Sequence, residues 1–128
     1  GGFDIAAMAG VYIGAAYYKL PVVIDGFISA VAALVAARLN NLTVDYMIPS
    51  HASYEPGYTY AVKGLGLEPA LMLNMRLGEG SGCPIMFMVV DAACAIIRDM
   101  ATFTEAAIDD EYLENIKGED SFSINKQP

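Results

Sequence analysis

The run Val22-Val23-Ile24-Asp25-Gly26 decides the fold class of this chain. Its first three residues are apolar and β-branched, with no polar residue alternating between them. Such a pattern is typical of a strand that is covered on both faces. Strands of this kind belong to parallel sheets flanked by helices, so the run predicts an α/β protein.

Two more short strands are predicted at nearly regular spacing, and each gap between strands holds one predicted helix. The predicted elements are helix 3–18, strand 22–24, helix 28–39, strand 45–48, helix 56–63, strand 70–74 and helix 84–100. Alternating strands and helices imply parallel strands joined by right-handed crossovers. We therefore expect an open parallel sheet with flanking helices. The glycines inside the first helix, Gly10 and Gly14, predict close packing against a neighbouring element.

Three loops follow the predicted strands. They are Asp25-Gly26-Phe27, Ser50-His51-Ala52-Ser53 and Arg76-Leu77-Gly78-Glu79-Gly80. An open parallel sheet binds its ligand beyond the carboxyl ends of its strands. These loops must gather at that edge, and they hold most of the unusual polar residues of the core. Their convergence predicts the ligand site.

Glu79 is the strongest candidate for chemistry in these loops. It lies between two glycines, so no neighbouring side chain shields its carboxylate from a ligand. A carboxylate within hydrogen-bond reach of a proton serves as a general base. The alternative is an exposed turn with a carboxylate near a helix N-terminus, where negative charge is mildly favoured. The convergence of the loops favours the functional interpretation.

The other polar residues keep two interpretations each. Asp25 holds either a ribose hydroxyl or a backbone amide, or it only caps the helix that follows. For Ser53, capping of the next helix is favoured over contact with a ligand. Arg76 either steers an anion or pairs with a carboxylate. His51, the only histidine, makes neither a triad nor a plausible metal site, so a structural or substrate-lining role is favoured. Asp91 is expected to be a paired core or interface group.

The composition excludes several classes of protein. Apolar residues make up 55% and the mean hydropathy is +0.42, yet the longest uncharged stretches, 5–18 and 26–37, are shorter than the roughly 20 residues that a bilayer needs. The net charge is −8 and seven of the fifteen acidic residues fall within 105–120. No basic stripe is present to neutralise phosphates, so nucleic acid is not expected as a partner. A membrane partner is not expected either.

Cofactor motifs and disulfides are not expected. The glycines around Glu79 lack the G-x-G-x-x-G spacing of a dinucleotide site, and no phosphate-binding P-loop is present. Cys83 and Cys94 lie on one predicted helix about 16 Å apart, too far for a disulfide. Free buried cysteines fit a reducing cytoplasm. The chain begins Gly1-Gly2 with no initiator methionine or signal peptide, and we expect it to be the C-terminal part of a longer protein.

Four blocks of sequence carry a family resemblance. They are Gly1–Gly10, Val23–Ala30, Ser50–Gly57 and Arg76–Gly82, and together they fall within residues 1–107. In this order they resemble the C-terminal part of the nicotinate-nucleotide–dimethylbenzimidazole phosphoribosyltransferase family. The resemblance implies a Rossmann-like sheet, a small helical domain to which the last helix contributes, and a homodimer. Residues 1–104 would then be the C-terminal part of the α/β domain, followed by an acidic tail segment over 105–128.

The resemblance also implies an activity. Family members transfer phosphoribose from nicotinate mononucleotide to dimethylbenzimidazole, which gives nicotinate and α-ribazole phosphate for the lower ligand of cobalamin. It implies that Glu79 is the catalytic base. The sequence itself suggests no metal or redox cofactor. Residues expected to lie against the nucleotide or the base are Asp25, Gly26, Phe27, Ser53, Leu77, Gly78 and Gly80. The alternative is a non-catalytic module that binds nucleotide or dimerises.

Overall fold

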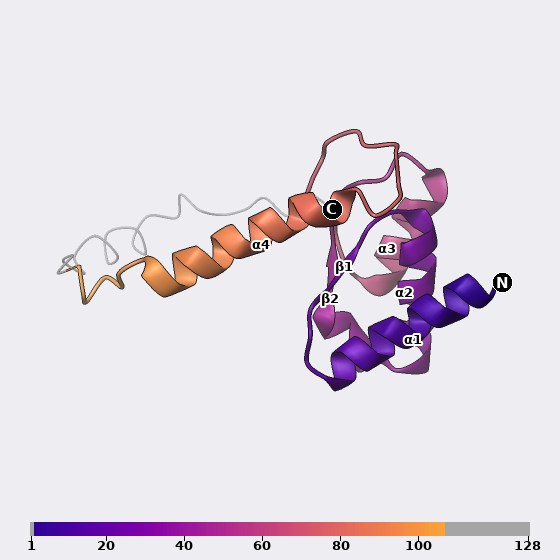
Figure 1. Ribbon diagram of the computed structural model, residues 1–128, viewed down its shortest axis with the longest axis horizontal. Helices are drawn as coiled ribbons and strands as arrows, with labels where there is room; N and C mark the ends of the chain where they lie inside the picture. Colours follow the sequence, from indigo (N-terminus) through magenta and orange to yellow (C-terminus); the bar gives the residue numbers. More distant parts are fainter. Residues whose placement is uncertain (1, 107–128) are drawn as a thin grey trace, which may run out of the picture. The chain divides into compact units, whose positions relative to one another are not determined.

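The computed structural model describes residues 2–106 of the chain (Figure 1). Its elements are α1 (Phe3–Tyr17), β1 (Val22–Ile24), α2 (Phe27–Leu39), the 3-10 helix η1 (Asn41–Tyr46), β2 (Met47–Pro49), α3 (Pro56–Leu65) and α4 (Gly82–Asp99). Residues 1–92 form one compact unit, and a second unit begins at Ala93. The sheet and every cavity described below belong to the first unit. Of the predicted tail segment, 105–128, residues 107–128 lie outside the described residues.

The sheet is parallel, which confirms the α/β class. Strands β1 and β2 pair in the register Val22↔Met47, Val23↔Ile48 and Ile24↔Pro49. They lie side by side in Figure 1. Within this chain Ile24 is the one fully buried residue of β1, and Val22 and Val23 are each partly exposed.

The predicted third strand, 70–74, is wrong as an extended element. Its only ladder contact among the described residues is an isolated parallel bridge between His51 and Leu71. The Leu71 amide donates to the Ser50 carbonyl at 2.9 Å. Three residues later Asn74 has a φ of +53°, in the left-handed region, which an extended strand does not accommodate. The chain therefore touches the sheet edge once and turns away.

Helix α2 lies between α1 and α3 (Figure 1). It presents four fully buried alanines to the core, Ala30, Ala32, Ala33 and Ala36. Small side chains let the neighbouring helices approach closely. The prediction that Gly10 and Gly14 pack closely against a neighbour is not met inside the described chain, since no atom lies within 4 Å of a Cβ built at either position.

The second strand begins two residues later than predicted because a 3-10 helix precedes it. The Asn40 side chain accepts a hydrogen bond from the Leu42 amide at 3.1 Å and starts η1. Asparagine commonly competes with regular structure in this way. Strand β2 is thus shifted to Met47–Pro49.

Helix α3 has the termini that its sequence predicts. Pro56 stands in its first turn, where its missing N–H costs no hydrogen bond. Gly66 ends it at a φ of +71°, with the Leu67 amide donating to the Val62 carbonyl at 3.1 Å. This is a Schellman arrangement. It returns residues 67–72 across α3 towards the sheet edge.

Within residues 2–106, no helix combines the length and the apolar composition that crossing a bilayer would take.

Candidate functional site

Two adjoining cavities lie where the loops after the strands meet. The first has a volume of about 440 Å³ and is lined by Gly26, Ile28, His51, Ser53, Tyr54, Glu55, Met75, Arg76, Leu77, Gly78 and Glu79. The second, of about 520 Å³, is lined by Met8, Tyr12, Val23, Asp25, Gly26, Phe27, Ile28, Ser29, Glu55, Gly78, Glu79, Gly80 and Cys83. Glu79 borders both. The predicted convergence of the three loops is confirmed.

The turn that carries Glu79 has an unusual backbone. Its φ angles are +72° at Gly78, +55° at Glu79 and +75° at Gly80. The Ser81 amide donates to the Gly78 carbonyl at 2.9 Å and closes the turn. Positive φ at both central positions is the pattern of a type I′ turn, which asparagine, aspartate and glycine favour. A left-handed glutamate costs about 1–2 kcal/mol, and such strain often marks a functional position.

Asp25 ties this turn to the end of β1. Its Oδ2 accepts a hydrogen bond from the Gly80 amide at 3.1 Å, and its Oδ1 accepts one from the Gly82 amide at 2.8 Å. The carboxylate is buried. It satisfies amides at the N-terminus of α4, where negative charge is stabilised by the helix dipole. Of the interpretations open at the sequence level, the structure shows the bond to backbone amide.

A buried serine and histidine lie directly behind Asp25. The Ser50 hydroxyl donates to the Ile24 carbonyl at 2.8 Å and lies 3.0 Å from His51 Nδ1. The same nitrogen is 3.8 Å from Asp25 Oδ1. His51 therefore supports the site from within the core, as its structural interpretation predicts.

Gly82 is required for α4 to reach this network. A Cβ built there would overlap the His51 ring and would lie 2.7 Å from Ser50 Oγ and 2.9 Å from Asp25 Oδ1. Neither Ser50 nor Gly82 was singled out from the sequence. The sequence offered one indication of the role of Gly82, a small residue near the start of a helix. That indication does not identify a site unless the residues that pack against Gly82 are known.

The remaining predicted contacts line one cavity or both. Phe27 borders the second cavity, but its ring also packs against α3: a Cβ on Gly57 would lie 2.5 Å from it. Ser53 borders the first cavity and donates to Glu55 Oε2 at 3.4 Å. The cap position of α3 is Glu55, so the predicted capping role of Ser53 is wrong. Leu77 borders the first cavity and is exposed.

Arg76 lies at the wall of the first cavity, whereas Asp91 lines neither of the two cavities. The Arg76 guanidinium lies 3.9 Å from the centre of the Tyr54 ring, a cation–π contact at the wall of the first cavity. Asp91 lies on α4 as an exposed residue, rather than in the core.

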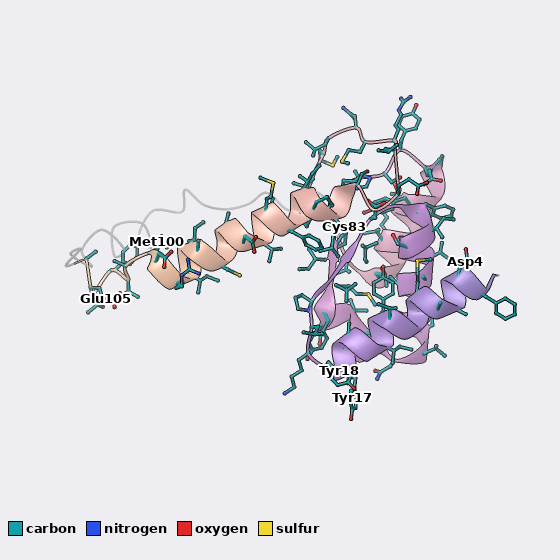
Figure 2. The ribbon with its side chains drawn as sticks, viewed as in Figure 1. Asp4, Tyr17, Tyr18, Cys83, Met100 and Glu105 are labelled. Carbon is teal, nitrogen blue, oxygen red and sulfur yellow. The ribbon has the colours of Figure 1, made fainter. Side chains whose placement is uncertain are left out.

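Two titratable groups that line the second cavity, the Tyr12 phenol and the Cys83 thiol, are kept neutral. Burial, opposed by a hydrogen bond to Ser29 and aided by the charges of Cys83 and Asp25, raises the pKa of Tyr12 to about 12. Cys83, in the first turn of α4 (Figure 2), has its pKa raised by burial and by Asp25. A thiol with a raised pKa is a poor nucleophile. Both cysteines are free, and among residues 2–106 no three His, Cys, Asp or Glu side chains gather as a metal site requires.

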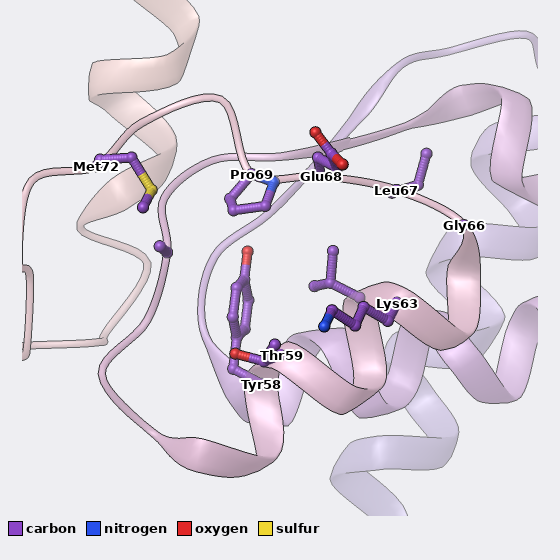
Figure 3. Close-up of a pocket in the computed structure, with 10 residues that line it drawn as sticks. Tyr58, Thr59, Lys63, Gly66, Leu67, Glu68, Pro69 and Met72 are labelled. Carbon is purple, nitrogen blue, oxygen red and sulfur yellow. The ribbon is translucent and has the colours of Figure 1, made fainter. Parts of the chain in front are cut away.

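A separate cavity of about 560 Å³ lies beside α3 (Figure 3). It is lined by Ala52, Tyr58, Thr59, Val62, Lys63, Gly66, Leu67, Glu68, Pro69 and Met72, none of which lines the other two. The Tyr58 hydroxyl points towards Pro69, and it is buried with no hydrogen-bond partner among residues 2–106. On its other side the Tyr58 ring stacks on His51, with centroids 6.5 Å apart.

Comparison with known proteins identifies the class to which this fold and site belong. A family model described as phosphoribosyltransferase matches residues 1–108. The chain therefore belongs to this phosphoribosyltransferase family, and the resemblance inferred from the four sequence blocks is confirmed.

Particular relatives carry a more specific name. The chain is 59% identical over 124 residues to nicotinate-nucleotide–dimethylbenzimidazole phosphoribosyltransferase of Clostridium perfringens, and the match covers 97% of the chain and 34% of the relative. It is 49% identical over 118 residues to the protein of that name from Clostridium tetani, covering 91% and 33%.

The same name belongs to a similar solved structure. The crystal structure of the Thermus thermophilus protein matches with a TM-score of 0.80 and 38% identity over 85% of this chain and 33% of that one. The chain thus spans about a third of the length of the relatives it matches.

Proposed function

We propose that this chain carries the proton acceptor and part of the substrate site of a nicotinate-nucleotide–dimethylbenzimidazole phosphoribosyltransferase. The single observation that supports it best is the position of Glu79, on the shared wall of two cavities. A reaction between two substrates needs its base where both can reach it. The names of the relatives supply the two substrates, nicotinate mononucleotide and dimethylbenzimidazole.

In the proposed reaction, the unprotonated ring nitrogen of dimethylbenzimidazole attacks the anomeric carbon of the nucleotide. The bond from that carbon to nicotinate breaks, and its electron pair neutralises the departing pyridinium ring. The second ring nitrogen of dimethylbenzimidazole gives its proton to the Glu79 carboxylate. The geometry of attack and departure on opposite faces is that of an inverting glycosidase, with an aromatic nitrogen in place of water.

The second carboxylate on the shared wall, Glu55, distinguishes this site from an ordinary turn. Glu55 borders the same two cavities and accepts from Ser53. Transition states of this type carry positive charge on the sugar ring, and two carboxylates nearby stabilise it electrostatically. Arg76 lines the first cavity and is the cationic candidate for the nucleotide phosphate in this proposal.

Several finer features belong to this proposal. The active protein is a cytoplasmic homodimer, and the remaining two-thirds of the length found in the relatives complete the substrate pocket. Residues 1–104 belong to the α/β domain, α4 contributes to a small helical domain, and 105–128 is an acidic tail segment.

The test uses the complete protein in which this chain occurs. Nicotinate release is followed with nicotinate mononucleotide in the presence and absence of dimethylbenzimidazole. Release that depends on dimethylbenzimidazole, with α-ribazole phosphate as the second product, is the expected result. Nucleotide binding by calorimetry without any turnover would overturn the proposal in favour of the non-catalytic module.

A further inference from the structure

We propose that Asp25, supported by His51 and Ser50, is a positioning residue that sets the direction in which Glu79 is presented. This inference rests on the proposed function for its catalytic consequence. Its structural part, the tie between Asp25 and the Glu79 turn, stands on the geometry alone.

The tie acts on the peptide unit that Glu79 itself belongs to. The Gly80 amide that donates to Asp25 Oδ2 at 3.1 Å is the N–H of the peptide joining Glu79 to Gly80. That peptide is planar, so holding its N–H direction fixes the rotation about the preceding Cα–C bond of Glu79. The Glu79 side chain is exposed and has glycine on both sides. Without the tie, its backbone has no side-chain restraint from its neighbours.

The second bond of Asp25 holds the other end of the same segment. The Gly82 amide donates to Oδ1 at 2.8 Å, so one carboxylate fixes the residues on both sides of Ser81. Bonds from amides to a carboxylate are about twice as strong as bonds between neutral groups. The turn and the start of α4 are thereby fixed to the end of β1 as one piece.

His51 and Ser50 fix the carboxylate in turn. Both are fully buried, at 1% and 0% exposure. His51 Nδ1 lies 3.0 Å from Ser50 Oγ and 3.8 Å from Asp25 Oδ1, so the imidazole confines the carboxylate on its buried side. The Tyr58 ring lies nearly parallel to the imidazole, with the ring centroids 6.5 Å apart. Such outer contacts are the usual means of locking the rotamer of a group that must be placed accurately.

The experiment compares Asp25→Asn, Glu79→Gln and the double variant in the complete protein, with the exposed Asp45→Asn as the matched control. An asparagine keeps one acceptor and cannot accept from both amides. We expect kcat to fall about 100-fold, as misplacement by about 1 Å does, with the KM for nicotinate mononucleotide changed less than about threefold. In the double variant the two losses should not multiply, because Asp25 acts through Glu79.

A second measurement does not depend on activity. Hydrogen exchange followed by mass spectrometry on the peptide that spans 78–83 should show faster exchange in Asp25→Asn than in the wild type. The milder Ser50→Ala variant gives the same direction if Asp25→Asn fails to fold. The inference would be overturned if the losses in kcat multiply in the double variant. It would also be overturned if hydrogen exchange in 78–83 is unchanged in both Asp25→Asn and Ser50→Ala. If the wild type has no transferase activity while exchange responds as expected, the proposed function fails and the tie stands.

Discussion

The cavity beside α3 and the two cavities around Glu79 have similar volumes, about 560 Å³ against 440 and 520 Å³, but they are built differently. Apart from Ala52, the wall beside α3 comes from one continuous segment, 58–72. The walls around Glu79 come from loops that are far apart in the sequence, and Asp25 joins two of them across 55 and 57 residues.

The difference lies in the polar groups rather than in size. Among residues 2–106, the buried Tyr58 hydroxyl beside α3 has no hydrogen-bond partner, and neither does the buried Ser81 hydroxyl in the Glu79 turn. Around Glu79, however, the buried side chains of Asp25, His51 and Ser50 bond to backbone groups or to each other. We infer that the cavity beside α3 arises where a helix packs against its own return loop, whereas polar loops that converge from distant parts of the chain and bond to one another mark a site.

The largest effect is expected for a change at Glu79, which borders the first two cavities. Glu79→Gln removes the proton acceptor while keeping the shape of the side chain. We expect kcat to fall by about 10² to 10⁴ in the complete protein, the usual contribution of a general base, with binding of nicotinate mononucleotide nearly unchanged. Steady-state rates and calorimetry measure the two quantities.

The matched control is Glu68→Gln, which alters a carboxylate beside α3 and should leave kcat within about twofold. Equal losses in both variants would erase the distinction between the two regions.

Gly82→Ala tests whether the site tolerates a single methyl group. The added Cβ would overlap Asp25, His51 and Ser50, and overpacking of this kind costs about 1–3 kcal/mol. The free energy of unfolding from urea denaturation should fall by that amount. Gly14→Ala is the control, since open space surrounds it, and alanine should raise helix stability by about 0.5–1 kcal/mol. The idea fails if the two glycines respond alike.

Glu79→Gly separates strain from catalysis. Glycine adopts a positive φ readily, whereas glutamate at +55° carries about 1–2 kcal/mol of backbone strain. Part of this gain is offset because glycine has more freedom in the unfolded chain. We expect a thermal midpoint that is equal to or above the wild type, together with loss of turnover. A clearly lower midpoint would mean that the Glu79 side chain itself stabilises the turn.

The smallest effect is expected beside α3. Burial, and to a lesser degree the charge of Asp25, raises the pKa of Tyr58 from 10.0 to about 12. The folded state therefore prefers the neutral phenol, so its stability is complete below pH 10 and falls as the pH rises through 12. Tyr58→Phe removes an unpartnered hydroxyl and should be neutral or slightly stabilising at pH 7.

The measurement is the thermal midpoint at several values between pH 8 and about 11.5. Tyr58→Phe should retain more of its midpoint than the wild type above pH 10. The exposed Tyr60, changed to phenylalanine, should show no such difference. A steep loss of stability in Tyr58→Phe at pH 7 would instead mean that the hydroxyl has a structural partner.

The parts of the fold that local physics decides were predictable from the sequence. The β-branched run at Val22 forms β1, and Pro56 and Gly66 bound α3, because each acts through its own backbone. The third strand was not predictable in the same way. Its apolar residues fit a strand, but Asn74 takes a left-handed conformation that sequence pattern does not reveal.

The candidate site was likewise predictable only in part. Strand spacing was enough to bring Gly26, Ser53 and Glu79 to one edge. It could not say that Asp25 would bond to Gly80 and Gly82, because which of several polar groups pair across a sheet edge depends on tertiary distances. The cap expected of Ser53 was wrong for a related reason: its hydroxyl bonds to Glu55 instead of to the helix.

The long-range bonds of Asp25 also bear on the order in which the protein folds. The bond from Ser50 to Ile24 closes a loop of 26 residues, whereas the bond from Gly82 to Asp25 closes one of 57. Loop-closure entropy makes the longer closure costlier by about 0.6–0.7 kcal/mol, and contacts between distant residues slow folding. We therefore expect β1 and β2 to pair before Asp25 bonds to Gly80 and Gly82. Glu79 would then acquire its orientation after the sheet that supports it has formed.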